Sequence, residues 1–335
     1  MNLTYMSGEK QREQCDMAYL FVHFRETDSV EGEQIYFSVS RDGFHWKMVN
    51  SGKAVIKADK GDLGVRDIVI TRTRDSQFVM MATDLALRRN EATKYEGSIK
   101  TAFQKGSKSL AMWKSEDLIH WSEEILVDLS DNHLGCLWAP GIFYDNKKDE
   151  YFIHWASTEK EDNYAGLSIY CSTTKDFETF SKPRLFYKKK DSETLDSCIC
   201  YENGTYHFFV KSFENPKAVI HMTASALMGK YVRDEEFDIQ MNQLYDRKAY
   251  EAPAIFVAGD HKPYLLMDYY GCEKREDQGY VPFAIEGLKA PKLKMVKDKF
   301  YFPYGFKHGV VIEITEGEYD KVLKWNKWNC FAINS

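Results

Sequence analysis

An isoleucine-centred strand pair recurs through this chain at a nearly constant interval, and this repeat limits the fold more than any other feature. Each copy is a short apolar strand around the isoleucine, a polar turn, and a second strand led by an aromatic residue. The isoleucine position is filled by Ile70, Ile142, Ile199, Ile255 and, in a partial last copy, Val311. The intervals between these positions are 72, 57, 56 and 56 residues. Such spacing is typical of a repeat architecture.

The two ends of the chain complete each other. The last copy has a first strand with little chain after it, whereas residues 18–46 read as the second to fourth strands of a unit that lacks a first strand. If these halves join, five units close into a ring without an exposed edge. The sequence therefore predicts an all-β, five-bladed β-propeller in which N-terminal strands pair with a C-terminal inner strand. A β-sandwich with accidental similarity between its strands is the alternative.

The repeat covers most of the chain, and no stretch rich in Pro, Gly or Ser divides it. We therefore expect a single domain over residues 1–335, with residues 1–16 as a polar tail or cap. Residues 319–335 form a C-terminal extension that is too short to be a domain. Residues 88–108 lengthen the first interval and read as a polar loop insertion. They could form a lid, an oligomer contact or a plain surface loop, and the sequence favours none of these.

Two kinds of turn stand out. The segments Ser40–Trp46 and Ser115–Trp121 share a Ser-x-Asp start and a closing tryptophan, and Thr174–Phe180 is a weaker copy. This pattern is typical of a turn that closes an outer strand and carries an aromatic plug. An earlier turn carries three acids, which we expect to be solvated: Asp28, Glu31 and Glu33.

Charge and composition argue against several classes of partner. A net charge of −6 disfavours nucleic acid. No run approaches the roughly 18 apolar residues that a membrane span needs, and the first residues lack the apolar segment of a secretory signal. The seven cysteines show no metal-type spacing, and we expect Cys198 and Cys200 to pack as thiols in a reducing compartment. A cytoplasmic location is predicted, whereas the oligomeric state cannot be predicted from the sequence.

Acidic residues recur at the entries of the repeated strands. The residue three before the isoleucine position is in turn Asp67, Ala139, Asp196, Ala252 and His308. The residue four before it is in turn Arg66, Trp138, Leu195, Glu251 and Lys307. Because the inner strands of a propeller meet at one mouth of its channel, we expect Asp67, Asp196 and Glu251 around one pocket. A single carboxylate at such a place could instead cap a strand or pair with a cation such as Arg66.

Three carboxylates around one pocket perturb each other's ionisation. Like charges at close range raise the pKa of at least one of them, so one acid can stay protonated near neutrality while another stays ionised. Glycoside hydrolysis uses this arrangement: one group protonates the leaving oxygen, and another deprotonates water or attacks the sugar.

These strand entries resemble the motifs of glycoside hydrolase family 43, five-bladed propeller enzymes that act on arabinose- and xylose-containing glycans. The first blade of that family opens on Asp-Pro-x-Ile, and this chain has Asp67-Ile68-Val69-Ile70. Trp138-Ala139-Pro140 is similar to the family's Trp-Ala-Pro, and Leu195-Asp196-Ser197 to its Ile-Asp-Pro. Glu251-Ala252-Pro253 is similar to Glu-Ala-Pro, and Lys307-His308-Gly309 to Arg-His-Gly. The resemblance spans roughly residues 18–315.

The resemblance implies a role for each acid. Asp67 would be the general base that activates water, Glu251 the general acid, and Asp196 the residue that tunes the pKa of the acid and orients it. The family inverts configuration, which implies about 6.5–9.5 Å between base and acid. Proline is missing after Asp67 and after Asp196, so the aim of these side chains is less constrained than in the family.

The resemblance also implies contacts with ligands. Trp138 is a candidate sugar platform, and Arg66 and His308 are further candidates for substrate binding. His308 resembles a channel histidine that often lies near a bound calcium in the family, so a structural calcium that it meets through waters is possible. The chemistry itself implies no cofactor.

The sequence thus favours an inverting, exo-acting glycosidase that removes arabinofuranosyl units from plant-type oligosaccharides. β-Xylosidase activity is the nearest variant, and the length of the chain favours an arabinosidase, because many xylosidase relatives carry an additional β-sandwich. A propeller that binds glycans without cleaving them is one alternative. A glycoside phosphorylase is another, and it would need a basic cluster, for which Arg66 and Lys307 are only a hint.

Overall fold

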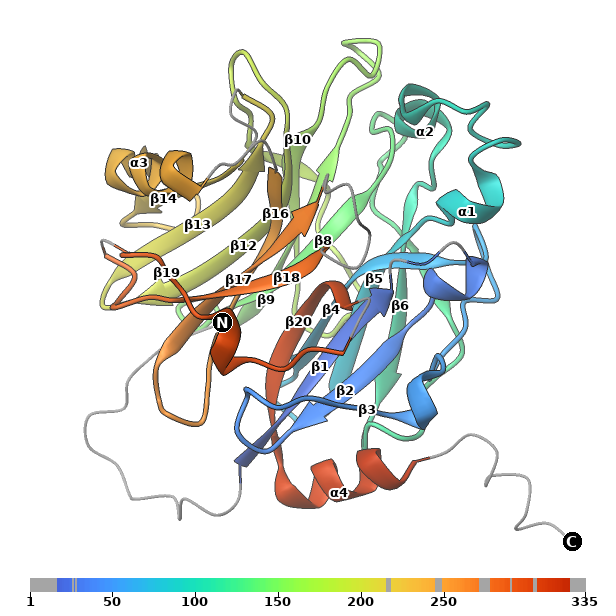
Figure 1. Ribbon diagram of the computed structural model, residues 1–335. Coiled ribbons are helices and arrows are strands. Elements are labelled where there is room, and N and C mark those ends of the chain that lie inside the picture. Colours follow the sequence, from blue (N-terminus) through green and yellow to red (C-terminus); the bar gives the residue numbers. More distant parts are fainter. Residues whose placement is uncertain are drawn as a thin grey trace, which may run out of the picture.

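The computed structural model describes residues 17–25, 27, 29–214, 218–244, 249–270, 278–289, 291–303 and 306–325. Within these residues the strands form five four-stranded antiparallel sheets (Figure 1). One strand of each sheet lines a central channel. The predicted five-bladed β-propeller is therefore confirmed.

Each blade begins with an inner strand that lines the channel. Blade one holds β4 (Val65–Arg72), β5 (Phe78–Asp84), β6 (Ser109–Ser115) and β7 (Ile125–Asp128). Blade two holds β8 (Trp138–Asp145), β9 (Glu150–Ser157), β10 (Ser168–Thr174) and β11 (Arg184–Tyr187). Blade three holds β12 (Thr194–Glu202), β13 (Thr205–Ser212), β14 (Ala218–Ala224) and β15 (Val232–Arg233). Blade four holds β16 (Ala249–Val257), β17 (Pro263–Tyr270), β18 (Gly279–Ala284) and β19 (Lys294–Met295).

The fifth blade joins the two ends of the chain. Its inner strand is β20 (Phe306–Thr315), and β1 (Met17–Arg25), β2 (Tyr36–Ser40) and β3 (Lys47–Met48) follow outward. β1 pairs with β20 from Met17 opposite Thr315 to Arg25 opposite Phe306, as the closure of the ring predicted. Residues 41–46 form the turn that was predicted for Ser40–Trp46, and the fourth strand, β3, begins after it at Lys47.

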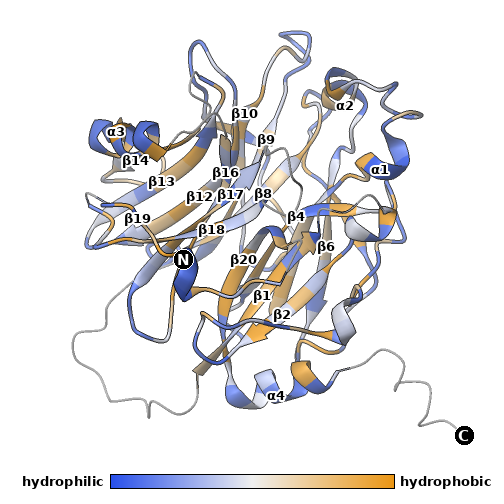
Figure 2. Ribbon diagram, viewed as in Figure 1, coloured by the Kyte–Doolittle hydropathy of each residue, from blue (hydrophilic) through white to orange (hydrophobic). Residues whose placement is uncertain are grey.

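The hydrophobic core lies between neighbouring blades. One cluster joins Leu20 and Val22 of β1 to Ile68 and Ile70 of β4. Burying one aliphatic side chain of this size contributes about 1.5–3 kcal/mol relative to leaving it exposed. Since a blade is covered on both faces, its middle strands are apolar on both faces; β5, for example, is buried throughout. In Figure 2 hydrophobic residues are frequent on the strands, many loops are hydrophilic, and the helices show both colours.

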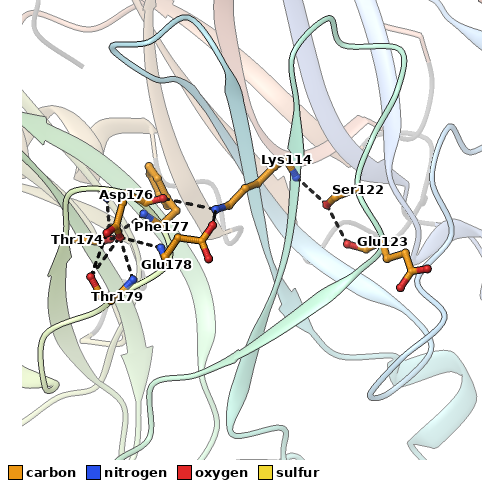
Figure 3. A network of polar contacts seen from close by, with 8 residues as sticks. All are labelled: Lys114, Ser122, Glu123, Thr174, Asp176, Phe177, Glu178 and Thr179. Atoms are coloured by element: carbon orange, nitrogen blue, oxygen red, sulfur yellow. Dashed lines mark hydrogen bonds and ion pairs between the residues drawn. The ribbon is translucent and has the colours of Figure 1, made fainter.

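The Ser-x-Asp turns close the third strands of three blades in the same way. Asp42, Asp117 and Asp176 each accept two backbone N–H groups from the residues that follow them. These hydrogen bonds hold the pKa of all three carboxyl groups at about 2 against the effect of burial. In Figure 3 the ammonium of Lys114 in blade one reaches the Asp176 carbonyl, 3.5 Å away, and the Glu178 carboxylate of blade two. The turns therefore also link neighbouring blades.

The insertion at residues 88–108 is folded and is not the loop that we expected. It contains most of α1 (Leu87–Asn90) and all of α2 (Ile99–Lys105), which lie together at one edge of the ring (Figure 1). Ala102 and Phe103 of α2 are buried, and so is Tyr95, whose hydroxyl donates to Asp62. These contacts fix the insertion against blades one and two.

Two further helices pack on the outside of the ring. Phe237 and Met241 of α3 (Glu235–Leu244) are buried against blades three and four. In α4 (Glu316–Lys324) a capping box joins Thr315 and Glu318. No helix in the described part of the chain is long and apolar enough to cross a membrane.

Candidate active site

The five inner strands bulge at the same place. In each strand the register shifts directly after the residue four positions before the central isoleucine or valine, so the residue three positions before it lies in the bulge. We call these two residues the entry pair. In β4, for example, the pairing with β5 shifts between Arg66 and Val69. The second residue of every entry pair has a left-handed backbone, with φ of 54° at Asp67, 51° at Ala139, 51° at Asp196, 50° at Ala252 and 33° at His308. Such conformations cost about 1–3 kcal/mol each and cluster at functional sites.

The bulges determine which side chains reach the mouth of the channel. In a regular strand neighbouring side chains point to opposite faces. A bulge re-aims the chain, so both residues of an entry pair can face one cavity. A cavity of about 140 Å³ at this mouth is lined by all five first residues and by the three second residues other than alanine: Arg66, Trp138, Leu195, Glu251, Lys307, Asp67, Asp196 and His308. The three acids therefore share one cavity.

Asp67 is held by two partners. Its Oδ1 lies 2.9 Å from Nδ1 of His308, and its Oδ2 accepts a hydrogen bond of 2.8 Å from the Thr83 hydroxyl. The Thr83 hydroxyl in turn accepts from the Ala139 N–H at 2.7 Å, which ties blade one to blade two. Burial alone raises the pKa of Asp67, but the charge of His308 and these hydrogen bonds outweigh it and lower the pKa to about 2. Asp67 is a fixed carboxylate at neutral pH.

Asp196 is the more deeply buried acid, with 3% of its side chain exposed. Its Oδ2 accepts from the Ala252 N–H at 3.2 Å, and its Oδ1 lies 3.8 Å from Nε2 of His308. Burial raises the pKa of Asp196 to about 7, and the carboxylates of Glu251 and Asp67 act in the same direction. Asp196 and Asp67, at equivalent positions, therefore differ in charge near neutrality.

His308 lies between these two acids. Burial lowers its pKa, but the Asp196 and Asp67 carboxylates outweigh this and raise the pKa to about 9. The backbone at its bulge is held by Tyr280, whose hydroxyl donates to the Gly309 carbonyl and accepts from the Gly309 N–H. His308 is thus an imidazolium that lies between the Asp67 carboxylate and the Asp196 carboxyl group.

The described side chains offer no direct set of calcium ligands at this place, and a calcium that His308 would meet through waters stays a prediction. A hard cation prefers oxygen ligands, whereas both ring nitrogens of His308 face the carboxylate oxygens that would have to serve the ion. No group of three or more His, Cys, Asp or Glu side chains among the described residues could hold a metal ion. We therefore assign no step to a metal.

Glu251 is the most exposed of the three acids, with 21% of its side chain accessible. Its Oε1 lies 3.6 Å from the Lys307 ammonium. The Tyr250 carbonyl, one residue earlier, accepts a hydrogen bond of 2.9 Å from the buried Lys211 ammonium. Glu251 is therefore the acid with the freest access to solvent and to a ligand at the mouth.

Arg66 forms an ion pair with Glu33, an acid that we had expected to be solvated. Its guanidinium lies 2.9 Å from Glu33, and it stacks on the Phe24 ring at 4.4 Å. Glu33 is buried and also accepts from the first two backbone N–H groups of α1, at Leu87 and Arg88. The expectation of a solvated turn is wrong for Glu33, whereas Glu31 is exposed and pairs with Lys57, and Asp28 lies outside the described residues.

An apolar wall completes the cavity. Trp138 lines it, although little of the indole is exposed and its ring packs on Phe103 at 5.2 Å. Leu87 at the start of α1 and Ile99 of the insertion also line the cavity, and Ile99 is 55% exposed. The insertion therefore forms one wall of the cavity, a role that the sequence alone did not assign to it.

The inner strands keep their bulges at Asp67 and Asp196, although no proline follows these residues. The bulges at Asp67 and Asp196 have the same left-handed φ as those at Ala139 and Ala252, which do precede proline. Ile68 is buried in the core after Asp67. Ser197 after Asp196 lies with its hydroxyl 2.7 Å from Nδ1 of His154 on the neighbouring blade.

The sequence patterns missed the residues opposite the entry pairs. On the second strands, Thr83 lies across from Arg66, Lys211 from Leu195 and Asp268 from Glu251. All three are buried. A polar residue inside an otherwise apolar strand was the available signal.

The fold is a five-bladed β-propeller with three carboxyl groups at one mouth of its channel, an arrangement that suits glycoside hydrolysis. The sequence matches the family model described as "Probable glycosyl hydrolase domain" over residues 15–320, so the chain belongs to this family 43-related group of glycosyl hydrolases. The resemblance seen in the motifs is confirmed.

Individual relatives agree with this assignment. The chain is 24% identical over 236 residues to an α-L-arabinofuranosidase of Bifidobacterium longum, over 64% of this chain and 21% of that protein. It therefore spans about a fifth of the length of this relative. A xylan β-1,4-xylosidase from Bacillus halodurans has a TM-score of 0.58 at 14% identity, over 85% of this chain and 54% of that chain. An endo-1,4-β-xylanase from Bacteroides thetaiotaomicron has a TM-score of 0.58 at 10% identity, over 89% and 94%. At these identities the structural likeness shows the fold.

Proposed function

We propose that this protein is an inverting glycoside hydrolase that removes single arabinofuranosyl or xylosyl units from the ends of plant-type oligosaccharides. The observation that carries the proposal is the gathering of three acids in one cavity, where His308 and Thr83 hold Asp67 as a carboxylate and Glu251 is open to the mouth. Hydrolysis needs both a base and a proton donor, and this cavity offers both.

Asp67 is the proposed general base. Its carboxylate is ionised throughout the physiological range, and His308 and Thr83 hold its orientation. It would take a proton from water as the water attacks the anomeric carbon from the face opposite the leaving group. This attack breaks the glycosidic bond with inversion.

Glu251 is the proposed general acid. It would give its proton to the glycosidic oxygen as the bond breaks, and its exposure to the mouth suits contact with a departing group. Asp196 would tune this acid, because the two groups interact electrostatically and Asp196 binds the backbone of the next residue, Ala252. The mechanism uses no cofactor.

The size of the cavity supports action on a terminal sugar. Its volume of about 140 Å³ is well below the roughly 300–1,000 Å³ of pockets for drug-sized ligands. One sugar ring suits such a site better than an internal stretch of glycan. The names of the relatives, an α-L-arabinofuranosidase and a xylan β-1,4-xylosidase, support a pentose as that sugar. A cytoplasmic location stays a prediction.

The phosphorylase alternative finds no support. It needs cations that are available to phosphate, but Arg66 is paired with Glu33 at 2.9 Å and Lys307 with Asp268 at 2.7 Å. The assay described next distinguishes an enzyme from the other alternative, a propeller that binds glycans without cleaving them.

We expect turnover of nitrophenyl α-L-arabinofuranoside or β-D-xylopyranoside in a panel that also contains nitrophenyl hexosides. Proton NMR during the first minutes of hydrolysis should show the sugar released with the anomeric configuration opposite to that of the substrate. Retention of configuration would contradict the assignment of Asp67 as a base. Binding of a pentoside without turnover would favour the non-catalytic alternative.

Thr83→Val is expected to lower kcat/KM roughly tenfold or more, since a hydrogen bond to a charged group contributes about 1.5–3 kcal/mol. Valine preserves the shape but removes the donor to Asp67. Without it the pKa of Asp67 rises, so the acidic limb of the pH–rate profile should move to higher pH. Thr83→Ser keeps the hydroxyl and should stay near the wild-type profile. An unchanged profile for Thr83→Val would show that this hydrogen bond does not support the base.

A further inference from the structure

A second layer of charge lies behind Glu251. Asp268 on β17 is directly opposite Glu251 on β16, and its side chain is fully buried. Its Oδ2 lies 2.7 Å from the Lys307 ammonium, which is 3.6 Å from Oε1 of Glu251. Asp268 is not among the residues that line the cavity. Two carboxylates therefore share one buried ammonium, and only one of them can meet a substrate.

The distances show which carboxylate holds the ammonium more closely. An opposite charge within about 4–6 Å favours the ionised form of a carboxyl group by 1–3 pKa units, and the effect grows as the distance shortens. An ammonium bound to Glu251 alone would therefore make it a poor proton donor. Burial raises the pKa of Asp268 to about 6 although Lys307 opposes this, so Asp268 is ionised at neutral pH and can hold Lys307.

We propose that Asp268 is a positioning residue for the proton donor: it holds the Lys307 ammonium in an ion pair and so leaves Glu251 able to keep the proton that it delivers. Lys307 stays close enough to stabilise the Glu251 carboxylate once that proton has left. This proposal rests on the assignment of Glu251 as the general acid.

Other charged groups also face Glu251, and they must stay constant in a test. Asp196 and His308 interact with it across the floor of the cavity, and Arg66 lines the same cavity. Lys211 binds the carbonyl of the preceding residue, Tyr250. Changes at Asp268 and Lys307 leave the identity of all these groups unchanged, so a shift in the pH profile reports on the shared ammonium.

The test is the alkaline limb of kcat/KM against pH, where activity falls as the general acid loses its proton. In Asp268→Asn, Lys307 has Glu251 as its closest anionic partner, and the limb should move to lower pH by about one unit or more. In Lys307→Met the ammonium is gone, and the limb should move to higher pH. In the double variant the two charges are removed together, and the limb should return toward wild type. The double variant also avoids an unpaired buried charge and keeps the test usable if Lys307→Met does not fold.

A matched control and a second readout exclude a merely structural effect. Asp145→Asn replaces another buried aspartate, one outside the cavity, and should leave the limb in place. Asp268→Asn should slow an alkyl pentoside about tenfold at neutral pH yet leave a dinitrophenyl pentoside nearly unchanged, because a dinitrophenolate departs without a proton. The proposal would be overturned if the alkaline limb did not move in Asp268→Asn and Lys307→Met, or if it moved in the same direction in both. Normal turnover of an alkyl pentoside by Glu251→Gln would instead remove the assignment of the acid, so the two failures are distinguishable.

Discussion

Glu251→Gln is expected to reduce turnover of an alkyl or disaccharide pentoside by about 10²–10⁴, the usual contribution of general acid–base catalysis. Glutamine has nearly the shape of glutamate but carries no acidic proton for the glycosidic oxygen. The leaving group would then depart as an unstable alkoxide. Since Glu251 is partly exposed at the mouth, its replacement should have little effect on the thermal stability of the fold.

The choice of leaving group makes this result specific. A dinitrophenyl pentoside needs no proton for departure, so Glu251→Gln should hydrolyse it at a rate near that of the wild type. The alkaline limb of the pH–rate profile, which reports the loss of the donor's proton, should disappear in the variant. Glu313→Gln is the matched control, because Glu313 lines the far part of the channel and not the cavity. If Glu251→Gln turned over the alkyl pentoside normally, another residue would have to be the acid.

The ring of five blades could be predicted because the repeat consists of apolar residues at a nearly constant spacing. Ile70, Ile142, Ile199, Ile255 and Val311 all line the channel, and the complementary ends of the chain do form one blade. Hydrophobic periodicity and edge pairing are local properties that a sequence displays directly. For the same reason the repeat predicts that Asp67, Asp196 and Glu251 lie at one mouth of the channel, where the structure has them.

The backbone at the entries could not be predicted. Asp67 and Glu251 occupy different positions relative to the isoleucine, and in regular strands these positions point to opposite faces. Only the bulge brings both residues to one cavity. The dipeptides Asp67-Ile68 and Asp196-Ser197 do not predict the left-handed backbone that the structure has at Asp67 and Asp196. Asp and His tolerate that region better than most residues do, but this preference is weak.

The partners of the acids were missed for another reason. Thr83, Lys211 and Asp268 lie on second strands, and their roles follow from the register between strands rather than from any motif. Glu33 lies in a charged turn, where solvation is the general expectation. Its burial follows from contacts with Arg66 and with the insertion, which are distant in sequence. Charges like these decide the ionisation of a site, and they become visible only when the blades are assembled.

Asp67→Asn is expected to reduce turnover by about 10²–10⁴ for activated and unactivated pentosides alike, because water attack needs the base whatever the leaving group is. Asparagine can still accept the Thr83 hydrogen bond, so pentoside binding should persist. This loss with both leaving groups distinguishes the base from the acid. Azide attacks without a general base, and it should restore part of the turnover and give a glycosyl azide of inverted configuration.

The same substitution should change the dependence of stability on pH. Folding lowers the pKa of Asp67 from 3.8 to about 2, so its carboxylate stabilises the fold above about pH 4 and loses this effect as the pH falls toward 2. Folding raises the pKa of His308 from 6.5 to about 9, so its contribution is full below about pH 6.5 and is lost as the pH rises through 9. The Tm of Asp67→Asn should therefore lie furthest below that of the wild type between about pH 4 and pH 6.5, and the two should converge in strong acid. A Tm difference that was independent of pH would show that Asp67 and His308 do not form the ion pair on which the orientation of the base depends.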